Sequence, residues 1–310
     1  MSFKIYLAKT RGMCAGVDRA IRVVNLALER YGASKVWVLH EVVHNHHVVK
    51  NLKDKGAIFV ESLDEIPNGS VVIFSAHGVG IATVKDAQKR NLTIIDATCP
   101  LVMRIHRKMN MAGKEGKDAI VIGHNGHQEV TGTIGQYMGD PSKVHVVLTP
   151  EDVNNLHIES QQIVFATQTT LSVDETAKTV AALKARFSQI EGPKTDDTCF
   201  ATQHRQSAVK ELARICDVVL VAGSKNSSNS NRLKEVAQSY GAKAYLIEDH
   251  TELNEEWFDG IKSVGITAGA SVPEYVVDGI LQDLKAKGHS EVEEVGQTPI
   301  KRTFALPDGI

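Results

Sequence analysis

Long apolar runs are missing from this sequence, and so is a strong excess of charge of either sign. Apolar segments such as Val71–Phe74 and Val218–Val221 have the length of strands, well short of the ~20 residues that a membrane-spanning helix needs. Lys, Arg and Asp are spread through the N-terminal region, which therefore lacks the apolar core of a signal peptide. We expect a cytoplasmic protein that does not bind membranes.

The charge balance argues against a nucleic-acid partner. Lys and Arg number 35 against 37 for Asp and Glu, and the basic residues form no long block, whereas nucleic-acid binders are usually more basic. The apolar fraction of 42% is enough to bury sizeable cores. A length of 310 residues then predicts two or three structural units.

Cysteine is scarce, and none of the four cysteines belongs to a C-x2-C motif, which excludes zinc ribbons and ferredoxin-type cluster motifs. In a cytoplasmic protein we expect reduced thiols or metal ligands rather than disulfides. Cys14, Cys99 and Cys199 each lie in a turn before a predicted helix, where free N–H groups and the helix dipole favour a thiolate. Cys216 lies between a helix and a strand, and we interpret it as a core residue.

Short apolar strand candidates alternate with amphipathic helical segments, which predicts an α/β fold with mainly parallel sheets. Measured from Cys14, Cys99 and Cys199, the alternation forms a loose threefold repeat. We therefore predict three α/β units. Their expected ranges are 1–97, which includes the N-terminal strand and Cys14, 98–193 with Cys99, and 194–285 with Cys199, followed by a tail at 286–310.

Polar loops follow the predicted strands, at the edge where open α/β sheets bind ligands. Their candidate anion-binding residues offer many hydrogen-bond donors and little negative charge: His44, His77, His127, Ser227, Ser228, Asn229 and Ser271. Such groups suit phosphate or diphosphate, and neither a Walker loop nor a G-x-G-x-x-G motif is present. For any one of these histidines alone, a solvated or internally hydrogen-bonded side chain is the more ordinary interpretation.

The three turn cysteines are either small buried residues or ligands that meet at the junction of the three units. In the second case they could hold a [4Fe–4S] cluster with one iron that lacks a protein ligand and acts as a Lewis acid. Glu129 lies two residues beyond His127 and is either a solvated loop residue or a proton donor. Thr169 and Thr170 would offer it a hydroxyl relay.

Eight segments together resemble the 4-hydroxy-3-methylbut-2-enyl diphosphate reductase family, in order from about residue 3 to residue 285. They are Cys14-Ala-Gly-Val-Asp-Arg19, His40-Glu-Val-Val-His-Asn45, Ser75-Ala-His-Gly78, Asp96-Ala-Thr-Cys-Pro100, Gly126-His-Gln-Glu129, Thr167-Gln-Thr-Thr170, Ser224-Lys-Asn-Ser-Ser-Asn-Ser-Asn-Arg232 and Thr267-Ala-Gly-Ala-Ser271. The resemblance implies a trefoil of three α/β units around a central iron–sulfur cluster.

The same resemblance assigns roles by position. It implies that Cys14, Cys99 and Cys199 bind a [4Fe–4S] cluster, and that Glu129 donates a proton. Thr169 is expected to contact the hydroxyl end of the substrate, and His127 to take part in catalysis. The diphosphate pocket is expected to consist of His44, His77, His127, Ser227, Ser228, Asn229 and Ser271.

The implied reaction is reductive dehydroxylation of an allylic diphosphate to isopentenyl and dimethylallyl diphosphate. Its two electrons would come from an external donor such as ferredoxin or flavodoxin, and we expect a monomer. Three other hypotheses remain at this stage. They are an electron-transfer protein whose closed cluster uses Cys216 as fourth ligand, a cluster-free phosphate-binding module with buried thiols, and an enzyme with one nucleophilic cysteine.

Overall fold

The computed structural model describes residues 3–194, 196–298 and 302–310, and its strands form sheets of five, four and three strands. All pairings between neighbouring strands are parallel, so the expected α/β class with parallel sheets is confirmed. The chain divides into two compact units. The first consists of Met1–Asp18, Val43–Asn51 and Phe200–Thr303, and the second of Arg19–Val42, Leu52–Cys199 and Phe304–Ile310.

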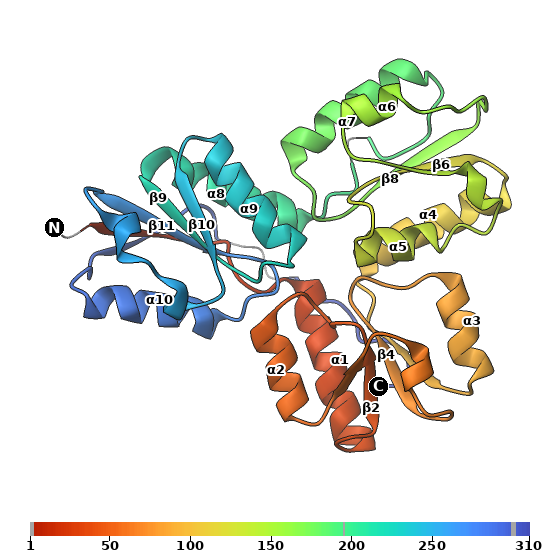
Figure 1. Cartoon of the computed structure of the whole chain (residues 1–310), viewed down its shortest axis with the longest axis horizontal. Coiled ribbons are helices and arrows are strands. Elements are labelled where there is room, and N and C mark those ends of the chain that lie inside the picture. The colour runs from red at the N-terminus through yellow and green to blue at the C-terminus, as the bar shows by residue number, and fades with distance from the viewer. Residues whose placement is uncertain (1–2, 195, 299–301) are drawn as a thin grey trace. The chain divides into compact units, whose positions relative to one another are not determined.

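The first unit is built on the five-stranded sheet, in the order β10-β9-β11-β1-β12. The strands are β1 (Lys4–Ala8), β9 (Val218–Ala222), β10 (Lys243–Ile247), β11 (Ser263–Ala268) and β12 (Val292–Val295). The helices are α8 (Phe200–Ile215), α9 (Ser228–Ser239) and α10 (Glu274–Ala286), with α10 on the opposite face of the sheet from α8 and α9 (Figure 1).

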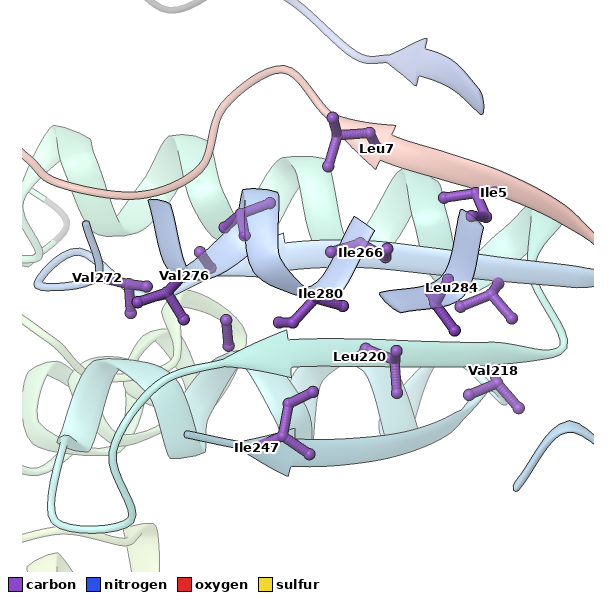
Figure 2. Close-up of a cluster of buried hydrophobic side chains, with 14 of the residues drawn as sticks. Ile5, Leu7, Val218, Leu220, Ile247, Ile266, Val272, Val276, Ile280 and Leu284 are labelled. Atoms are coloured by element: carbon purple, nitrogen blue, oxygen red, sulfur yellow. The ribbon is translucent and has the colours of Figure 1, made fainter. Parts of the chain in front are cut away.

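Residues of β9 alternate between two apolar cores, as expected for a strand covered on both faces. Val218 and Leu220 pack against Ile280 and Leu284 of α10, as Figure 2 shows. Val219 and Val221 face the other way and pack with Val209 and Leu212 of α8 and Leu233 and Val236 of α9. Every residue of β9 is buried, which explains its uninterrupted apolar sequence.

The strands β1 and β12 belong to a different sheet from the one that the sequence predicts. The sequence predicts that the N-terminal strand belongs to the first unit and that the third unit ends at residue 285. In the structure β1 pairs with β11 on one side and with β12 on the other, in the sheet of the third predicted unit. Local apolar patterns identify a strand but not its partner, because pairing depends on contacts between distant residues.

The second unit contains the other two sheets. One has the order β3-β2-β4-β5, with β2 (Val36–Leu39), β3 (Ile58–Val60), β4 (Val71–Phe74) and β5 (Thr93–Asp96). The helices that precede or follow these strands in the chain are α1 (Ala15–Tyr31), α2 (His46–Asp54) and α3 (Ile81–Lys89), and the first two run from one unit into the other. Val72 and Phe74 pack with Ala87 of α3 in the core of this sheet.

The three-stranded sheet of the second unit has the order β7-β6-β8, with β6 (Asp118–Ile122), β7 (Val144–Val147) and β8 (Ile163–Thr167). The helices α4 (Pro100–Lys114) and α5 (Gln128–Ile134) cover one face, while α6 (Pro150–Asn154) and α7 (Val173–Arg186) cover the other. Ala119 and Val121 contact the first pair, and Ile120 and Ile122 the second. Among the described residues, no helix is both long and apolar enough to cross a bilayer.

Candidate functional site

The three turn cysteines occupy equivalent places in the structure. Cys14 and Cys199 immediately precede α1 and α8, and Cys99 is the N-cap residue of α4. Each backbone N–H donates to the carbonyl oxygen of a loop that follows a strand: that of Cys14 to Ala270 at 3.0 Å, that of Cys99 to Ala76 at 3.0 Å and that of Cys199 to Thr169 at 3.1 Å. The threefold repeat predicted from spacing therefore extends to the hydrogen bonds of the cysteine loops.

The three turn cysteines are the thiols that could hold a metal group. None of them is in a disulfide, and all three residues are partly exposed. Within the described residues of either unit, no three His, Cys, Asp or Glu side chains are placed to hold one ion. In a [4Fe–4S] cluster each thiolate binds a different iron atom, so three separate cysteines suit that group.

Cys216 differs from the other three cysteines in its burial and in its place at the end of a helix. It is 7% exposed and packs among Val209, Leu212 and Val219 in the core of the first unit. Burial raises the pKa of its thiol to about 12, with a smaller contribution from Asp217. A thiol in that environment stays protonated and is a poor metal ligand.

In the first unit, the loops after β11 and β9 approach the residues that precede α2. The Ser271 hydroxyl donates to the carbonyl oxygen of His44 at 2.9 Å, and the backbone N–H of His46 donates to Ser224 Oγ at 3.1 Å. His44, Ser271 and the serine-rich loop are thereby brought together. The serine-rich loop and Ser271 follow β9 and β11, adjacent parallel strands whose carboxyl ends share one sheet edge, whereas His44 follows β2 of another sheet.

Asn229 is the most informative residue of this group. Its side chain is 6% exposed, and neither its amide nitrogen nor its amide oxygen has a hydrogen-bond partner within the described protein. Ser227 is the N-cap residue of α9 and accepts from the backbone N–H of Ser230. A Cβ on Gly269 would lie 3.3 Å from Asn229 Nδ2, so glycine permits this approach. A buried amide left without a partner is costly unless a ligand supplies one.

In the second unit, His77 and His127 come together from separate strand-end loops. Their ring centroids lie 5.9 Å apart and their planes are nearly perpendicular, at 88°. The His77 Nδ1 lies 3.4 Å from Ser75 Oγ, and His127 Nδ1 accepts from the backbone N–H of Glu129 at 3.1 Å. Of the three candidate histidines, these two share one unit and His44 lies in the other.

Close packing of α5 on the His77 loop keeps the two histidines near each other. A Cβ on Gly132 would lie 2.9 Å from the Gly78 carbonyl oxygen, a separation that real Cβ atoms do not show. In the same contact between α5 and the His77 loop, the carbonyl oxygen of Gly135 accepts from the backbone N–H of Ile81 at 2.9 Å. Glycine at 132 is therefore required by the approach of two backbones.

Glu129 is buried, with 2% exposure, and both carboxyl oxygens contact Thr169. Its Oε1 accepts from the Thr169 backbone N–H at 2.6 Å, and its Oε2 from the Thr169 hydroxyl at 2.9 Å. Burial raises the pKa of Glu129 to about 7; the two Thr169 hydrogen bonds oppose the shift, and the charge of Asp197 adds to it. A carboxyl with this pKa can carry a proton at neutral pH.

Asp197 is a site residue that the sequence did not reveal. It is 6% exposed, its Oδ2 accepts from the Thr167 backbone N–H at 3.2 Å, and its own N–H donates to Thr167 Oγ1 at 2.9 Å. Lys108 Nζ lies 3.6 Å from the same carboxylate. The adjacent pair Asp196-Asp197 just before Cys199 was the available signal, but an acidic pair in a loop is usually solvated.

The predicted residues thus fall into two groups. The first unit holds Cys14, His44, Ser227, Ser228, Asn229 and Ser271, and the second holds Cys99, Cys199, His77, His127, Glu129 and Thr169. Thr170, expected to extend a hydroxyl relay, accepts from Gln168 Nε2 at 3.0 Å. The hydroxyl that contacts Glu129 is that of Thr169.

Comparison with known sequences gives one consistent result. A family model described as LytB protein matches residues 5–285. A curated relative from Haemophilus influenzae (strain PittGG), named 4-hydroxy-3-methylbut-2-enyl diphosphate reductase, is 50% identical over 305 residues, which are 98% of this chain and 97% of the relative. A relative of the same name from Aeromonas hydrophila subsp. hydrophila is 52% identical over 291 residues, 94% of this chain and 93% of that one.

Solved structures agree with the sequences. The E-1-hydroxy-2-methyl-but-2-enyl-4-diphosphate reductase from Plasmodium falciparum is 33% identical and superposes with a TM-score of 0.93, covering 99% of this chain and 96% of that one. A second structure, described as (E)-4-hydroxy-3-methyl-but-2-enyl diphosphate reductase, the terminal enzyme of the non-mevalonate pathway, is 31% identical, with a TM-score of 0.64 over 92% of this chain and 99% of that one.

Proposed function

The chain belongs to the LytB family, and from this membership we propose that it reduces 4-hydroxy-3-methylbut-2-enyl diphosphate to isopentenyl and dimethylallyl diphosphate. LytB proteins are iron–sulfur enzymes. We assign the ligands of the cluster to Cys14, Cys99 and Cys199, which are not in disulfides, are partly exposed and precede helices. A [4Fe–4S] cluster bound there would supply a Lewis-acidic iron and two electrons, received one at a time from an external donor.

The substrate's diphosphate would be held by the donor-rich loops. Asn229 offers a buried amide without a hydrogen-bond partner among the described residues, and Ser227, Ser228 and Ser271 would add hydroxyl groups. His44, His77 and His127 would add further donors. A rigidly held diphosphate fixes the position of the allylic hydroxyl at the other end of the substrate, which is catalysis by positioning.

Proton delivery is assigned to Glu129. The reaction removes the hydroxyl group as water and consumes two protons with its two electrons, and Glu129 has the pKa of a group that is protonated near neutrality. Thr169 holds both carboxyl oxygens and would orient the acid toward the leaving hydroxyl. His127, whose Nδ1 accepts from the Glu129 backbone N–H, fixes the start of α5.

One observation carries this proposal. Thr169 joins the proposed acid to a proposed cluster ligand, because its N–H and hydroxyl bind Glu129 while its carbonyl oxygen accepts from the Cys199 N–H. This shared residue supports a proton donor close to a cluster ligand, as reduction of a substrate at the cluster would require. The electron donor, ferredoxin or flavodoxin, the cytoplasmic location and the monomeric state remain predictions from the sequence.

Iron and sulfide analysis of protein purified without oxygen tests the proposal. We expect about four iron and four sulfide atoms per chain, the stoichiometry of a cubane cluster. Cys14→Ser, Cys99→Ser and Cys199→Ser should each lose iron, while Cys216→Ser serves as the matched control and should keep it. Loss of iron in Cys216→Ser would favour a closed cluster with four cysteines. Iron-free wild-type protein after anaerobic reconstitution would reject the proposed reaction.

A further inference from the structure

An arginine follows each of the three turn cysteines at nearly constant spacing. Arg19 lies five residues after Cys14, Arg104 five after Cys99 and Arg205 six after Cys199, all on the helix that each cysteine precedes. Each arginine contacts the loop that carries a different cysteine.

Arg19 on α1 reaches the loop of Cys99. Its side chain is buried, Nη1 donates to the Thr98 carbonyl oxygen at 3.1 Å, and Nη2 lies 3.5 Å from the Asp96 carbonyl oxygen. The remaining donor, Nε, binds the Ala305 carbonyl oxygen at 2.6 Å. Burial lowers the pKa of Arg19, while the charges of Asp96 and Cys99 act to raise it. Since a guanidinium stays protonated in proteins, a buried positive charge lies under this loop.

Arg205 on α8 reaches the loop of Cys14. It is 5% exposed, and both Nε and Nη2 donate to the carbonyl oxygen of Gly12, two residues before the cysteine. Its Nη1 binds the Ala201 carbonyl oxygen at 2.9 Å, which anchors the side chain to its own helix. Two donors of one planar group on one carbonyl leave little freedom for the loop.

Arg104 on α4 reaches the loop of Cys199. Its Nη2 lies 3.4 Å from Oδ1 of Asp197, two residues before the cysteine, and Lys108 contacts the other carboxylate oxygen. The Arg104 side chain is 66% exposed while that of Asp197 is 5% exposed, so this contact is weaker than the other two.

We propose that Arg19, Arg104 and Arg205 are positioning residues arranged in a closed cycle, in which the helix after each cysteine fixes the loop of the next ligand. The helix after Cys14 holds the Cys99 loop, that after Cys99 holds the Cys199 loop, and that after Cys199 holds the Cys14 loop. Each contact presents a positive charge beside a loop that must hold a thiolate. The inference rests on the proposed function for the ligand role of the cysteines.

Hydrogen–deuterium exchange on the full chain, purified anaerobically, tests the cycle loop by loop. The reporters are the backbone amides of Cys14, Cys99 and Cys199, which are hydrogen-bonded in the wild-type protein. Arg205→Met should accelerate exchange at the Cys14 loop, and Arg19→Met at the Cys99 loop, each by about tenfold or more, as expected for a lost hydrogen bond to a charged group. Arg104→Met should accelerate the Cys199 loop by about two- to fivefold, because it is exposed.

Matched controls lie on the same helices. Arg22→Met on α1, Arg107→Met on α4 and Arg214→Met on α8 replace exposed arginines and should change none of the three loops. Arg104→Met removes an exposed side chain and should remain folded even if a buried arginine proves indispensable. Equal acceleration in all three loops, or no change at the Cys199 loop of folded Arg104→Met, would overturn the cycle.

Two measurements on the same samples separate this inference from the proposed function. Iron content reports on the cluster alone. If the protein binds no iron after reconstitution but each arginine variant still accelerates exchange only at its own target loop, the arginine cycle stands and the cluster is rejected. In iron-loaded protein, Arg19→Met should lower the midpoint reduction potential, because a positive charge is lost near a ligand. Arg19→Lys should restore the potential in part. An unchanged potential in Arg19→Met would show that the charge of Arg19 does not act on the cluster.

Discussion

The role of Glu129 can be predicted from the sequence, but the protonation state of its carboxyl depends on the fold. The sequence placed it in a polar, glycine-bearing loop, where a glutamate is usually solvated. In the structure it is buried between α5 and the loop after β8, and burial outweighs the two Thr169 hydrogen bonds that favour the carboxylate. The result is a carboxyl whose pKa lies about where a proton donor works best at neutral pH.

Replacement of Glu129 by Gln should change the pH dependence of stability. The folded-state pKa of about 7 exceeds the ordinary value of 4.5, so the folded state binds more protons between these values. The contribution of Glu129 to the wild-type free energy of unfolding is then highest below about pH 4.5 and falls as pH rises through about 7, by roughly 3 kcal/mol. Gln cannot ionise and removes this loss.

Chemical denaturation of both proteins at about pH 4 and 8 measures the effect, with exposed Glu29→Gln as control. The difference in unfolding free energy between Glu129→Gln and wild type should move in favour of the variant at the higher pH. A pH-independent difference would mean that folding does not raise the pKa of Glu129. The same variant should keep iron and bind substrate but lose most turnover.

At the scale of elements, α5 is a helix whose place depends on a single glycine. It is short, and its first turn carries Glu129 while its N-cap is His127. Gly132 lets the helix backbone touch the loop of His77. The spacing of the two histidine loops therefore depends on a contact between two backbones and not on a side chain.

Gly132→Ala should push α5 and the His77 loop apart. The added Cβ would meet the Gly78 carbonyl oxygen at 2.9 Å, and we expect a loss of about 1–3 kcal/mol in unfolding free energy, typical of overpacking. Substrate affinity should fall together with stability, because His77 and His127 move. Thr131→Ala, at the neighbouring exposed position, is the control and should change neither. Unchanged affinity in Gly132→Ala would separate this contact from the diphosphate site.

At the scale of the whole molecule, the C-terminal segment takes part in the second unit. Ala305 accepts from Arg19 Nε, and the carbonyl oxygen of Gly309 accepts from Arg30 Nη1 at 2.8 Å. Both arginines belong to α1. The segment 304–310 thus binds the helix whose arginine holds the Cys99 loop.

Truncation after Thr303 should weaken that arrangement. We expect a loss of about 1–3 kcal/mol in unfolding free energy, since Arg19 and Arg30 lose backbone acceptors and Arg19 is buried. Thermal unfolding measures the loss, with Arg30→Met as the control for the exposed contact alone. A truncated protein as stable as wild type, with normal exchange at the Cys99 loop, would contradict this role of the tail.

Features that depend on neighbouring residues could be predicted from the sequence, whereas features that depend on residues far along the chain could not. The strand-length run Val71–Phe74 has the bounds that the structure gives, and Val218–Val221 ends one residue before β9 does, because apolar runs between turn residues are local signals. The sheet of β1 and β12, the carboxylate of Asp197 and the targets of the three arginines depend on partners far along the chain. Local patterns contain no information on those partners.

The place of β1 between two strands that come much later in the chain has a consequence for biosynthesis. β1 leaves the ribosome long before β11 and β12, some 260 and 290 residues later, and its edges stay unpaired until these strands are made. The second unit can meanwhile complete both of its sheets from residues already synthesised. Translation therefore imposes an order on folding, in which β1 is secured long after it is made and stays exposed to chaperones and proteases until β11 and β12 have followed.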